Sequence, residues 1–332
     1  MINFIKMKNF SLLIASAIAI FFLILGYILG KSSSSPTIFS ERRNQGSYKF
    51  INPLLECDSS VNFSQNASLS PLKTSLEKTI SQLQNNHQLS YASIYFRDLN
   101  NGPWLGINEK EYFSPASLIK IPLAITYFKA AQNNPELLQE SIEATISSKI
   151  EKQSILPRLT LSPDQKYTID ELIRRMIVYS DNQAYEILLN HIDNPLLVQT
   201  FTDLGIDISA GFTNPSGNII TVKSYAAFFR VLFNASYLNQ EMSEKLLSLL
   251  SQVEYQNALV RGVNNPQIII SHKFGERTFE ATSERQLHDC GIVYYPQKPY
   301  LVCIMTRGQD LSKLSTAIAE LSRVVYNSVS KN

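Results

Sequence analysis

The chain has 332 residues, of which 44% are hydrophobic and 17% charged, and its 12 glycines and 14 prolines exclude a collagen-like repeat or a long disordered polymer. Its 30 basic and 28 acidic residues give a net charge of +2 without a block of like charge in the body of the chain, which argues against nucleic acid as a partner. The cysteines lack the close spacing of a structural zinc site, so we expect no metal. Cys290 and Cys303 lie on adjacent predicted strands, and we expect them to be buried free thiols, with a pair that faces each other as the alternative.

The N-terminal segment predicts a membrane anchor. Residues 10–29 contain no charge, and as a helix they are about 30 Å long, the thickness of a bilayer core. The run ends in Gly30-Lys31 and four serines, not in the small-x-small site of a signal peptide. We therefore expect an uncleaved single-pass anchor after a cytoplasmic tail of residues 1–9, with a cleaved signal peptide as the alternative. The flanking charges hardly decide its orientation.

A tether and then one folded domain follow the anchor. Residues 30–66 are rich in Ser and Asn and predict a tether, whose apolar island at 51–55 docks onto the domain. The domain is expected at 67–330. Its first helix is indicated by apolar residues at spacings of three and four, namely Leu72, Leu76, Ile80 and Leu83.

Strand-like runs lie at both ends of this domain. Two early runs and three late runs are predicted, at 89–97, 104–107, 268–272, 287–295 and 301–306. Residues 117–262 between them are predicted to be helical, and an apolar stripe from Leu311 to Val325 predicts a C-terminal helix. This order predicts an α/β (α+β) fold, in which both ends of the domain form a single antiparallel sheet and a helical lobe is inserted between them.

The first candidate for chemistry is the sequence Ser117-Leu118-Ile119-Lys120. A spacing of three at the start of a helix places the hydroxyl and the amine on one face, within reach of each other. The apolar run that follows drives Lys120 into the core, and burial favours its neutral, basic form. The motif alone is weak, because the same spacing occurs at Ser70, Ser75 and Ser328. The alternative is a serine that caps a core helix beside a snorkelling lysine.

Two further polar clusters follow along the chain. Ser180-Asp181-Asn182 precedes a helical run, and its alternative role is to cap that helix. Lys273-Phe274-Gly275 lies at the end of an apolar strand. A glycine there lets a substrate backbone approach the strand edge, whereas the alternative is an ordinary bulge glycine.

In their order and placement, the three motifs resemble those of class A β-lactamase-like serine hydrolases, within the β-lactamase and penicillin-binding protein superfamily, over about residues 69–328. The resemblance implies a β-lactamase/transpeptidase-like fold and an acyl-enzyme mechanism. It implies that Ser117 is the nucleophile, that Lys120 is its general base, and that Ser180 passes a proton to the leaving nitrogen.

The same resemblance implies a set of substrate-binding residues. Asn182 would bind the amide side chain of the substrate, and Lys273 would hold its carboxylate. The oxyanion hole would consist of the backbone N–H groups of Ser117 and of Glu276, the residue just past Gly275.

Two departures from the family pattern concern the later steps of the reaction. The family's glutamate for deacylation, in a Glu-x-x-Leu-Asn context, has no counterpart here. The acids between Asn182 and Thr221 are Glu186, Asp193, Asp203 and Asp207. Phe274 stands where the family has a hydroxyl that assists carboxylate binding. We therefore expect acylation of Ser117 and slow deacylation.

The sequence thus predicts a membrane-anchored serine hydrolase, single-pass in the cell membrane, with its catalytic domain outside the cytoplasm. We expect a monomer that needs no cofactor and whose substrate is a β-lactam or a peptidoglycan peptide. One alternative is a D-alanyl-peptide carboxypeptidase or transpeptidase that acts on peptidoglycan. Another is a catalytically silent domain that binds cell-wall peptides.

Overall fold

The computed structural model describes residues 48–53, 69–100, 102–147, 153–206 and 217–331. The chain divides into two units, Met1–Arg42 and Arg43–Asn332, and all described residues belong to the second. The anchor predicted at 10–29 therefore lies outside the described residues. Within the described part of the chain, no helix is both long and apolar enough to cross a bilayer.

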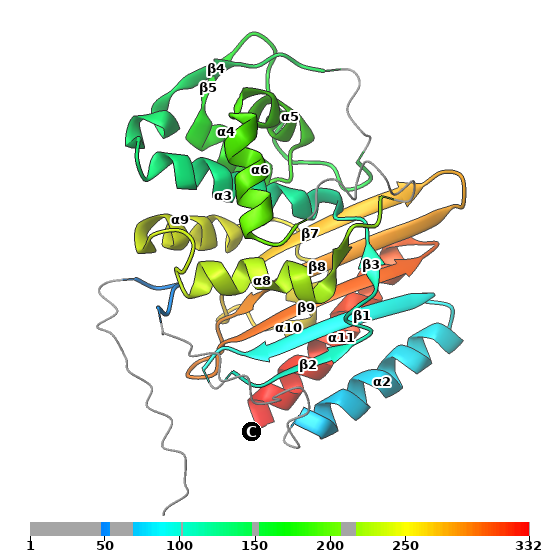
Figure 1. The fold of residues 1–332 in the computed structure, drawn as a ribbon. Helices are drawn as coiled ribbons and strands as arrows, with labels where there is room; N and C mark the ends of the chain where they lie inside the picture. Colours follow the sequence, from blue (N-terminus) through cyan, green and yellow to red (C-terminus); the bar gives the residue numbers. More distant parts are fainter. Residues whose placement is uncertain (1–47, 54–68, 101, 148–152, 207–216, 332) are drawn as a thin grey trace, which may run out of the picture. The chain divides into compact units, whose positions relative to one another are not determined.

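A five-stranded antiparallel sheet lies at the centre of the second unit, in the order β2-β1-β9-β8-β7 (Figure 1). The start of the domain supplies β1 (Tyr91–Asp98) and β2 (Trp104–Ile107). Its end supplies β7 (Ile270–Phe279), β8 (Glu284–Val293) and β9 (Tyr300–Gly308). The predicted α/β fold, with one sheet formed by both ends of the domain, is confirmed. The strand predicted at 268–272 is too short, because pairing of β7 with β8, and not apolar content, extends it to Phe279.

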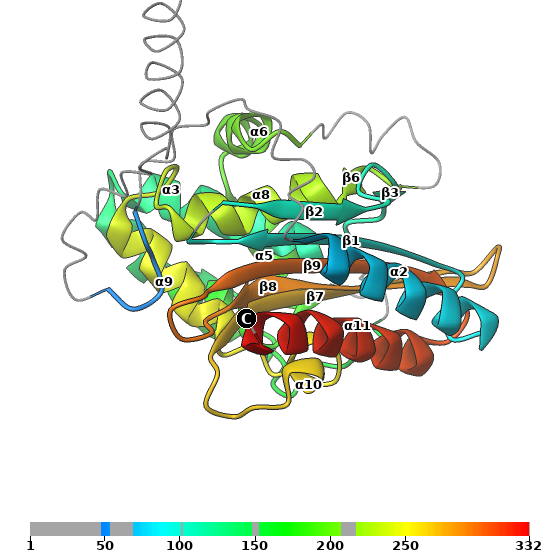
Figure 2. The same cartoon turned by 90° about the horizontal axis from the view of Figure 1, so that it is seen from below.

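One face of the sheet is covered by α2 (Ser70–Asn85), α10 (Leu259–Val263) and α11 (Leu311–Lys331) (Figure 2). The apolar stripes predicted for the first and last helices are the buried faces of α2 and α11. Gly262 lets α10 approach α11 closely, because a Cβ at this position would lie 2.4 Å from the carbonyl oxygen of Ala319.

The opposite face carries α8 (Val222–Phe233) and α9 (Gln240–Leu250), and a helical lobe lies on the β7 side of the sheet (Figure 1). The lobe contains α3 (Lys120–Ala131), α4 (Ile169–Val178), α5 (Asn182–His191) and α6 (Asn194–Asp203), with 3₁₀ helices η3 (Ala116–Ile119) and η4 (Pro135–Gln139).

Short strands interrupt the region predicted to be helical. β4 (Ser141–Glu143) pairs with β5 (Lys166–Thr168), and β6 (Ile220–Thr221) pairs with β3 (Tyr112–Phe113), which precedes this region. The prediction that residues 117–262 are helical is therefore wrong at β4, β5 and β6. Strands of two or three residues are too short to show an alternating pattern in the sequence.

Residues 48–53, at the far end of the predicted tether, dock onto the domain. Phe50 and Ile51 are buried in its core. The N–H groups of Lys49, Phe50 and Ile51 donate to the carboxylate of Glu244 on α9, at 2.6, 2.8 and 3.1 Å. The folded domain therefore includes residues that precede its first helix, α2, by about twenty positions.

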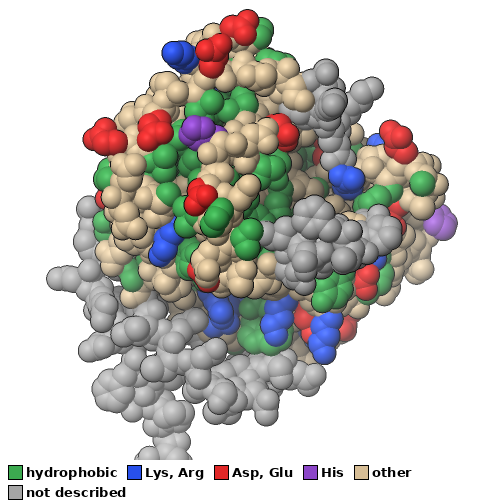
Figure 3. All heavy atoms as spheres, turned by 45° about the horizontal axis from the view of Figure 1, so that its top comes forward, with side chains coloured by type: hydrophobic (Ala, Val, Ile, Leu, Met, Phe, Trp, Pro, Cys, Tyr) green, Lys and Arg blue, Asp and Glu red, His purple; other side chains and the backbone are tan. Residues whose placement is uncertain are grey.

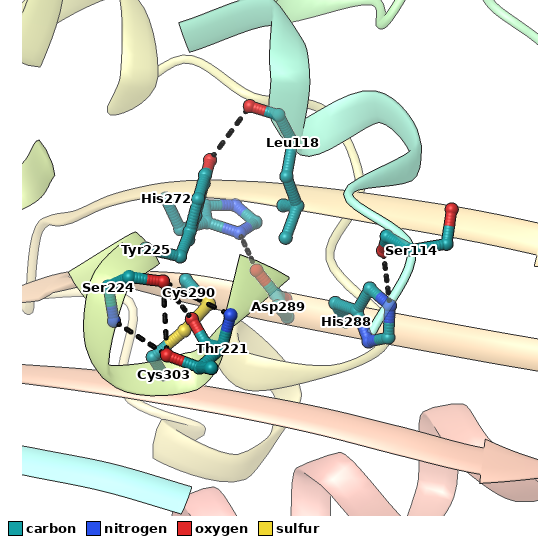
Figure 4. Close-up of a disulfide and its surroundings, with 10 residues drawn as sticks. All are labelled: Ser114, Leu118, Thr221, Ser224, Tyr225, His272, His288, Asp289, Cys290 and Cys303. Atoms are coloured by element: carbon teal, nitrogen blue, oxygen red, sulfur yellow. Dashed lines mark hydrogen bonds and ion pairs between the residues drawn. A yellow bond between two sulfur atoms is a disulfide. The ribbon is translucent and has the colours of Figure 1, made fainter. Parts of the chain in front are cut away.

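Cys290 on β8 and Cys303 on β9 form a disulfide near the start of α8 (Figure 4). The prediction of free thiols is wrong, because the strand register places the two residues directly opposite each other. Both side chains are completely buried.

Candidate active site

Ser117 lies on η3, in a turn with an unusual backbone conformation. The preceding residue, Ala116, has φ of +46°, in the left-handed region that non-glycine residues seldom adopt. Ser117 itself is half-buried, and its hydroxyl forms no hydrogen bond with any described residue. The surroundings must hold such a turn in place, since its own sequence does not favour it.

Three buried side chains hold the backbone on either side of Ser117, two of them shown in Figure 4. The Gln286 side-chain oxygen accepts the N–H of Ser114 at 3.0 Å, and Nε2 of His288 donates to the Ser114 carbonyl at 3.1 Å. Tyr225 donates its hydroxyl to the Leu118 carbonyl at 3.2 Å. The turn is thus positioned by β8 and α8. Sequence reasoning missed these residues, because no local pattern links them to the turn.

The protonation state of His288 is consistent with this role. Burial lowers the pKa of His288 to about 3, so the ring is neutral at physiological pH. A neutral imidazole has one N–H, and the contact with the Ser114 carbonyl places that proton on Nε2.

Gly275 brings β7 against the same turn. A Cβ at Gly275 would lie 3.1 Å from the backbone nitrogen of Ser117 and 3.2 Å from that of Leu118. Either nitrogen would be crowded by any larger residue at this position. The predicted neighbours Ser117 and Gly275 are therefore adjacent in space, although 158 positions separate them in the sequence.

Lys120 extends from the start of α3 into a closed polar pocket. Its side chain is 1% exposed. Nζ donates to the Ser180 carbonyl at 2.7 Å, to the Ser180 hydroxyl at 3.2 Å and to the side-chain oxygen of Asn182 at 2.7 Å. The expected hydrogen bond between Lys120 and Ser117 is absent among the described residues. In its charged form the amine has three N–H donors, and these three acceptors occupy all of them, so only its neutral form has a lone pair that can take a proton.

Lys273 approaches the Ser180 hydroxyl from β7. Its side chain is completely buried, and Nζ donates to Ser180 Oγ at 2.8 Å and to the Phe274 carbonyl at 3.1 Å. Ser180 has φ of +57°, and this backbone conformation turns its carbonyl toward Lys120 and its hydroxyl toward both amines. The structure therefore places one hydroxyl between two lysine amines.

Burial moves the pKa of both lysines downward. Desolvation lowers the pKa of Lys120 well below its usual value, and the nearby charge of Lys273 lowers it further, while Asp181 and Glu276 oppose the shift. Desolvation lowers the pKa of Lys273 to about 7, and Asp289 opposes that shift. The shift favours the neutral form of Lys120, whose amine is able to accept a proton.

The Ser180-Asp181-Asn182 cluster also begins a helix, as the alternative interpretation proposed. Asp181 is the N-cap of α5, and its carboxylate accepts the N–H groups of Gln183 and Ala184 at 2.7 and 3.3 Å. Burial raises the pKa of Asp181, and those two hydrogen bonds oppose the shift. The capping and catalytic interpretations are compatible, because the cap fixes the direction in which Asn182 faces Lys120.

A buried pair lies beside Lys273 on β7. His272 and Asp289 meet at 2.8 Å between Nδ1 and Oδ1 (Figure 4), and the other oxygen of Asp289 accepts the N–H of Leu259 at 3.0 Å. Both side chains are almost completely buried. Neither residue belongs to the three sequence motifs. Within the described ranges, no group of three or more His, Cys, Asp or Glu side chains is arranged to hold a metal ion.

Lys120, Ser180, Asn182 and Lys273 meet where β7 faces the helical lobe, a region that we call the cleft. Phe274 does not contribute a polar group to it. Its ring is 3% exposed and packs on Tyr255 with the ring centroids 4.3 Å apart. The amine of Lys273 lies 4.3 Å from the centroid of the same ring. Phe274 thus shields Lys273 from water and offers no hydroxyl to a substrate.

The acidic residues that follow the Ser180 cluster make no described contact with Ser117 or Lys120, or are not among the described residues. Asp203 accepts hydrogen bonds from Tyr237 and Gln199 at 2.9 and 2.6 Å. Asp193 is the N-cap residue of α6, Glu186 lies within α5, and Asp207 is outside the described residues. No hydrogen bond or ion pair joins the first three to Ser117 or Lys120 in the part of the chain that is described.

The wall opposite β7 includes a residue that the sequence did not suggest. The side-chain nitrogen of Gln153 donates to the Ser180 carbonyl at 3.0 Å. Two residues further on, the N–H of Ile155 donates to the Glu276 carboxylate on β7 at 2.6 Å. Glu276 therefore contributes a side-chain contact to the cleft as well as its backbone.

The charges on the surface do not indicate a particular binding partner. Acidic and basic side chains are interspersed with apolar and polar ones on the face drawn in Figure 3, and neither sign forms a broad patch there. The interior of the cleft is therefore the more informative part of the molecule.

The comparisons with known proteins agree with this geometry. A sequence model described as the β-lactamase enzyme family matches residues 75–329. A β-lactamase from Sphaerobacter thermophilus DSM 20745 is similar in structure, with a TM-score of 0.67 and 20% identity over 78% of this chain and 98% of that one. A class A β-lactamase from Bacteroides cellulosilyticus DSM 14838 has a TM-score of 0.65 and 17% identity over 79% and 99%.

A third similar structure is a variant of PBP-A as an acyl-enzyme complex with penicillin G. It shares 22% identity over 80% of this chain and 98% of that one, with a TM-score of 0.65. At such identities the structural likeness establishes the fold alone. No curated protein sequence matches the chain significantly.

Proposed function

Because the chain belongs to the β-lactamase enzyme family, we propose that it is a serine hydrolase that is acylated at Ser117 by a β-lactam or a related amide and is deacylated slowly. One observation carries the proposal. The Ser180 hydroxyl accepts hydrogen bonds from two buried amines, those of Lys120 and Lys273, beside the turn that presents Ser117. A structural serine has no need of two desolvated amines, whereas a proton relay does.

Acylation follows from these groups. The neutral amine of Lys120 takes the proton of the Ser117 hydroxyl, and Oγ forms a bond to the carbonyl carbon of the substrate. The C–N bond then breaks. The leaving nitrogen takes a proton from the Ser180 hydroxyl, and Ser180 regains one from Lys120.

The negative charge that develops on the carbonyl oxygen needs donors. The backbone N–H groups of Ser117 and Glu276 are the donors that we propose, and the close approach at Gly275 supports this pairing. Each such donor typically contributes about 3 kcal/mol to the stabilisation of a transition state. Asn182 and Lys273 would bind the amide and the carboxylate of the substrate.

For deacylation, no base is evident among the described acids that follow Asn182. Asp203 is hydrogen-bonded to Tyr237 and Gln199, and Glu186 and Asp193 lie within α5 and at the N-cap of α6. Loss of a positioned base lowers a rate by about 10² to 10⁴. The acyl-enzyme should therefore accumulate.

A peptidase that acts on D-alanyl peptides is the second candidate. The absence of the family's deacylation motif favours it, and PBP-A, one of the similar structures, was captured as an acyl-enzyme with penicillin G. Release of D-alanine from a D-Ala-D-Ala peptide, measured beside nitrocefin hydrolysis, distinguishes the two activities.

Covalent labelling by a fluorescent penicillin tests the proposal. We expect the wild type to be labelled and Ser117→Ala to remain unlabelled while folded. Ser75→Ala is the matched control, because Ser75 also precedes a lysine by three residues but lies exposed on α2. Labelling that survives in Ser117→Ala contradicts the assignment, and a folded wild type without labelling favours a silent domain that binds cell-wall peptides.

We further propose that residues 10–29 anchor the protein in the cell membrane with the catalytic domain outside the cytoplasm. The length of the apolar run supports the anchor, and the disulfide between Cys290 and Cys303 supports an oxidising compartment. The full chain should sediment with membranes, and a chain that starts at residue 45 should be soluble and active. Recovery of a native form shortened by about thirty residues would indicate cleavage of a signal peptide.

A further inference from the structure

The cleft beside Ser117 is crossed by a segment that contacts both of its walls. At one end, Gln153 donates to the Ser180 carbonyl on the lobe side. At the other, the N–H of Ile155 donates to the carboxylate of Glu276 on β7, at 2.6 Å. We call residues 153–158 the crossing segment.

The crossing segment alternates between half-buried and exposed side chains, although it bends at Ser154, Ile155 and Arg158. Gln153, Ile155 and Pro157 are half-buried, whereas Ser154, Leu156 and Arg158 are exposed, Leu156 at 78%. Arg158 continues the attachment through an ion pair with Glu254 at 2.7 Å.

The charges around this contact are asymmetric. The two cationic groups, Lys120 and Lys273, are at most 1% exposed and donate to partners within the protein. Phe274 supplies no donor to an anion. The carboxylate of Glu276 is half-buried and follows directly after Gly275, which touches the Ser117 turn. A substrate carboxylate bound by Lys273 would therefore also meet the negative charge of Glu276, which opposes its binding.

We propose that Glu276 is a specificity-determining residue, whose carboxylate accepts the N–H of Ile155 and, against the attraction of Lys273, disfavours substrates that bring a carboxylate beside the scissile bond. Acyl donors whose leaving side is uncharged or carries an N–H or ammonium donor are favoured, because such a donor replaces the N–H of Ile155 on Glu276. This inference rests on the proposed acylation of Ser117 and narrows the class of substrate.

Three variants separate the effect of the charge from that of the contact. Glu276→Gln removes the charge but keeps a side-chain oxygen that accepts the N–H of Ile155. Glu276→Ala removes both. Glu280→Gln is the matched control, because it removes the same charge from an exposed position just beyond the end of β7.

Acylation by penicillin G and by its methyl ester is the first measurement. In Glu276→Gln, we expect kcat/KM for acylation by the free acid to rise about fivefold, as relief of like-charge repulsion predicts, while that by the ester stays within about twofold. Glu280→Gln should change neither rate. Equal changes for acid and ester, or an equal gain in Glu280→Gln, would overturn the proposal.

Hydrogen exchange of the Ile155 amide is the second measurement, and it does not depend on catalysis. Glu276→Ala should raise its exchange rate at least about tenfold, and Glu276→Gln should raise it less, since the carbonyl oxygen still accepts the bond. Exchange in Glu276→Ala equal to that of the wild type overturns the closed contact. If the wild type is labelled by neither ligand, the proposed function fails, and this measurement still decides the contact.

Discussion

The interface between α11 and the sheet differs from the cleft between β7 and the helical lobe in how each buries its side chains. Leu314, Ile318, Leu321 and Val325 of α11 are completely buried against apolar neighbours. The cleft buries Lys120, Lys273 and Ser180 just as deeply, but in a network of hydrogen bonds.

The difference shows which buried side chains stabilise the fold and which lower its stability. Apolar burial contributes roughly 25 cal/mol per Å², whereas a buried amine loses its hydration and recovers it only in part through its partners. That loss is also the cause of the low pKa of both lysines. Burial of the two amines therefore costs stability and favours their neutral forms. We expect variants in the cleft to change the acylation rate, and variants under α11 to change the free energy of unfolding.

The largest effect is expected from Lys120→Met. This change keeps the volume of the side chain but removes the base, so the acylation rate should fall by about 10² to 10⁴. Stopped-flow measurement with a chromogenic cephalosporin gives the rate, and circular dichroism confirms the fold. An unchanged acylation rate would show that Lys120 is not the base, and that the buried amines of the cleft do not serve acylation as proposed.

Leu321→Ala on α11 is expected to lower the stability of the protein without changing its acylation rate. A cavity at a completely buried leucine lowers the free energy of unfolding by about 2 to 5 kcal/mol. The acylation rate of the protein that remains folded should not change. Urea denaturation and labelling at low urea measure the two quantities. A loss of acylation rate without a loss of stability would show that the two regions are not independent.

The pH dependence of acylation reports on Lys273. Its pKa of about 7 means that the amine is charged below that pH and neutral above it. If the charged form binds a carboxylate, kcat/KM for penicillin G falls as the pH rises through about 7. The methyl ester should show no such fall. Parallel profiles for the two compounds would show that Lys273 does not bind the carboxylate.

The smallest effect is expected from Tyr225→Phe. This change removes only the hydroxyl that donates to the Leu118 carbonyl, and loss of one such bond costs about 1 kcal/mol. If that bond positions Ser117, the maximal acylation rate falls about threefold to tenfold while the concentration of β-lactam for half-maximal rate stays constant. A change in melting temperature with no change in rate would show that Tyr225 supports the fold only.

The sequence predicted the fold because its strongest signals are local. Leu72, Leu76, Ile80 and Leu83 recur in the sequence at helical spacing, and the same four residues form the buried face of α2. The three motifs are likewise short. Their order along the chain predicted residues that the structure brings together at Ser180.

The remaining features depend on register between distant segments. A shift of β8 by one residue would move His288 to the other face of the sheet and separate Cys290 from Cys303. No pattern near Ser114 indicates that Gln286, 172 residues away, binds its N–H. The contact of Glu276 with Ile155 is of the same kind.

Acylation of Ser117 followed by slow deacylation can be measured through the mass of the intact protein after addition of a β-lactam. We expect one equivalent of adduct, located on the peptide that contains Ser117 and formed in a rapid burst. The adduct should then be lost about 10² to 10⁴ times more slowly than by an enzyme with a positioned base for water. Rapid steady-state hydrolysis without a detectable adduct would contradict slow deacylation. It would show that a carboxylate activates the water in a way that the contacts of Glu186, Asp193 and Asp203 do not reveal.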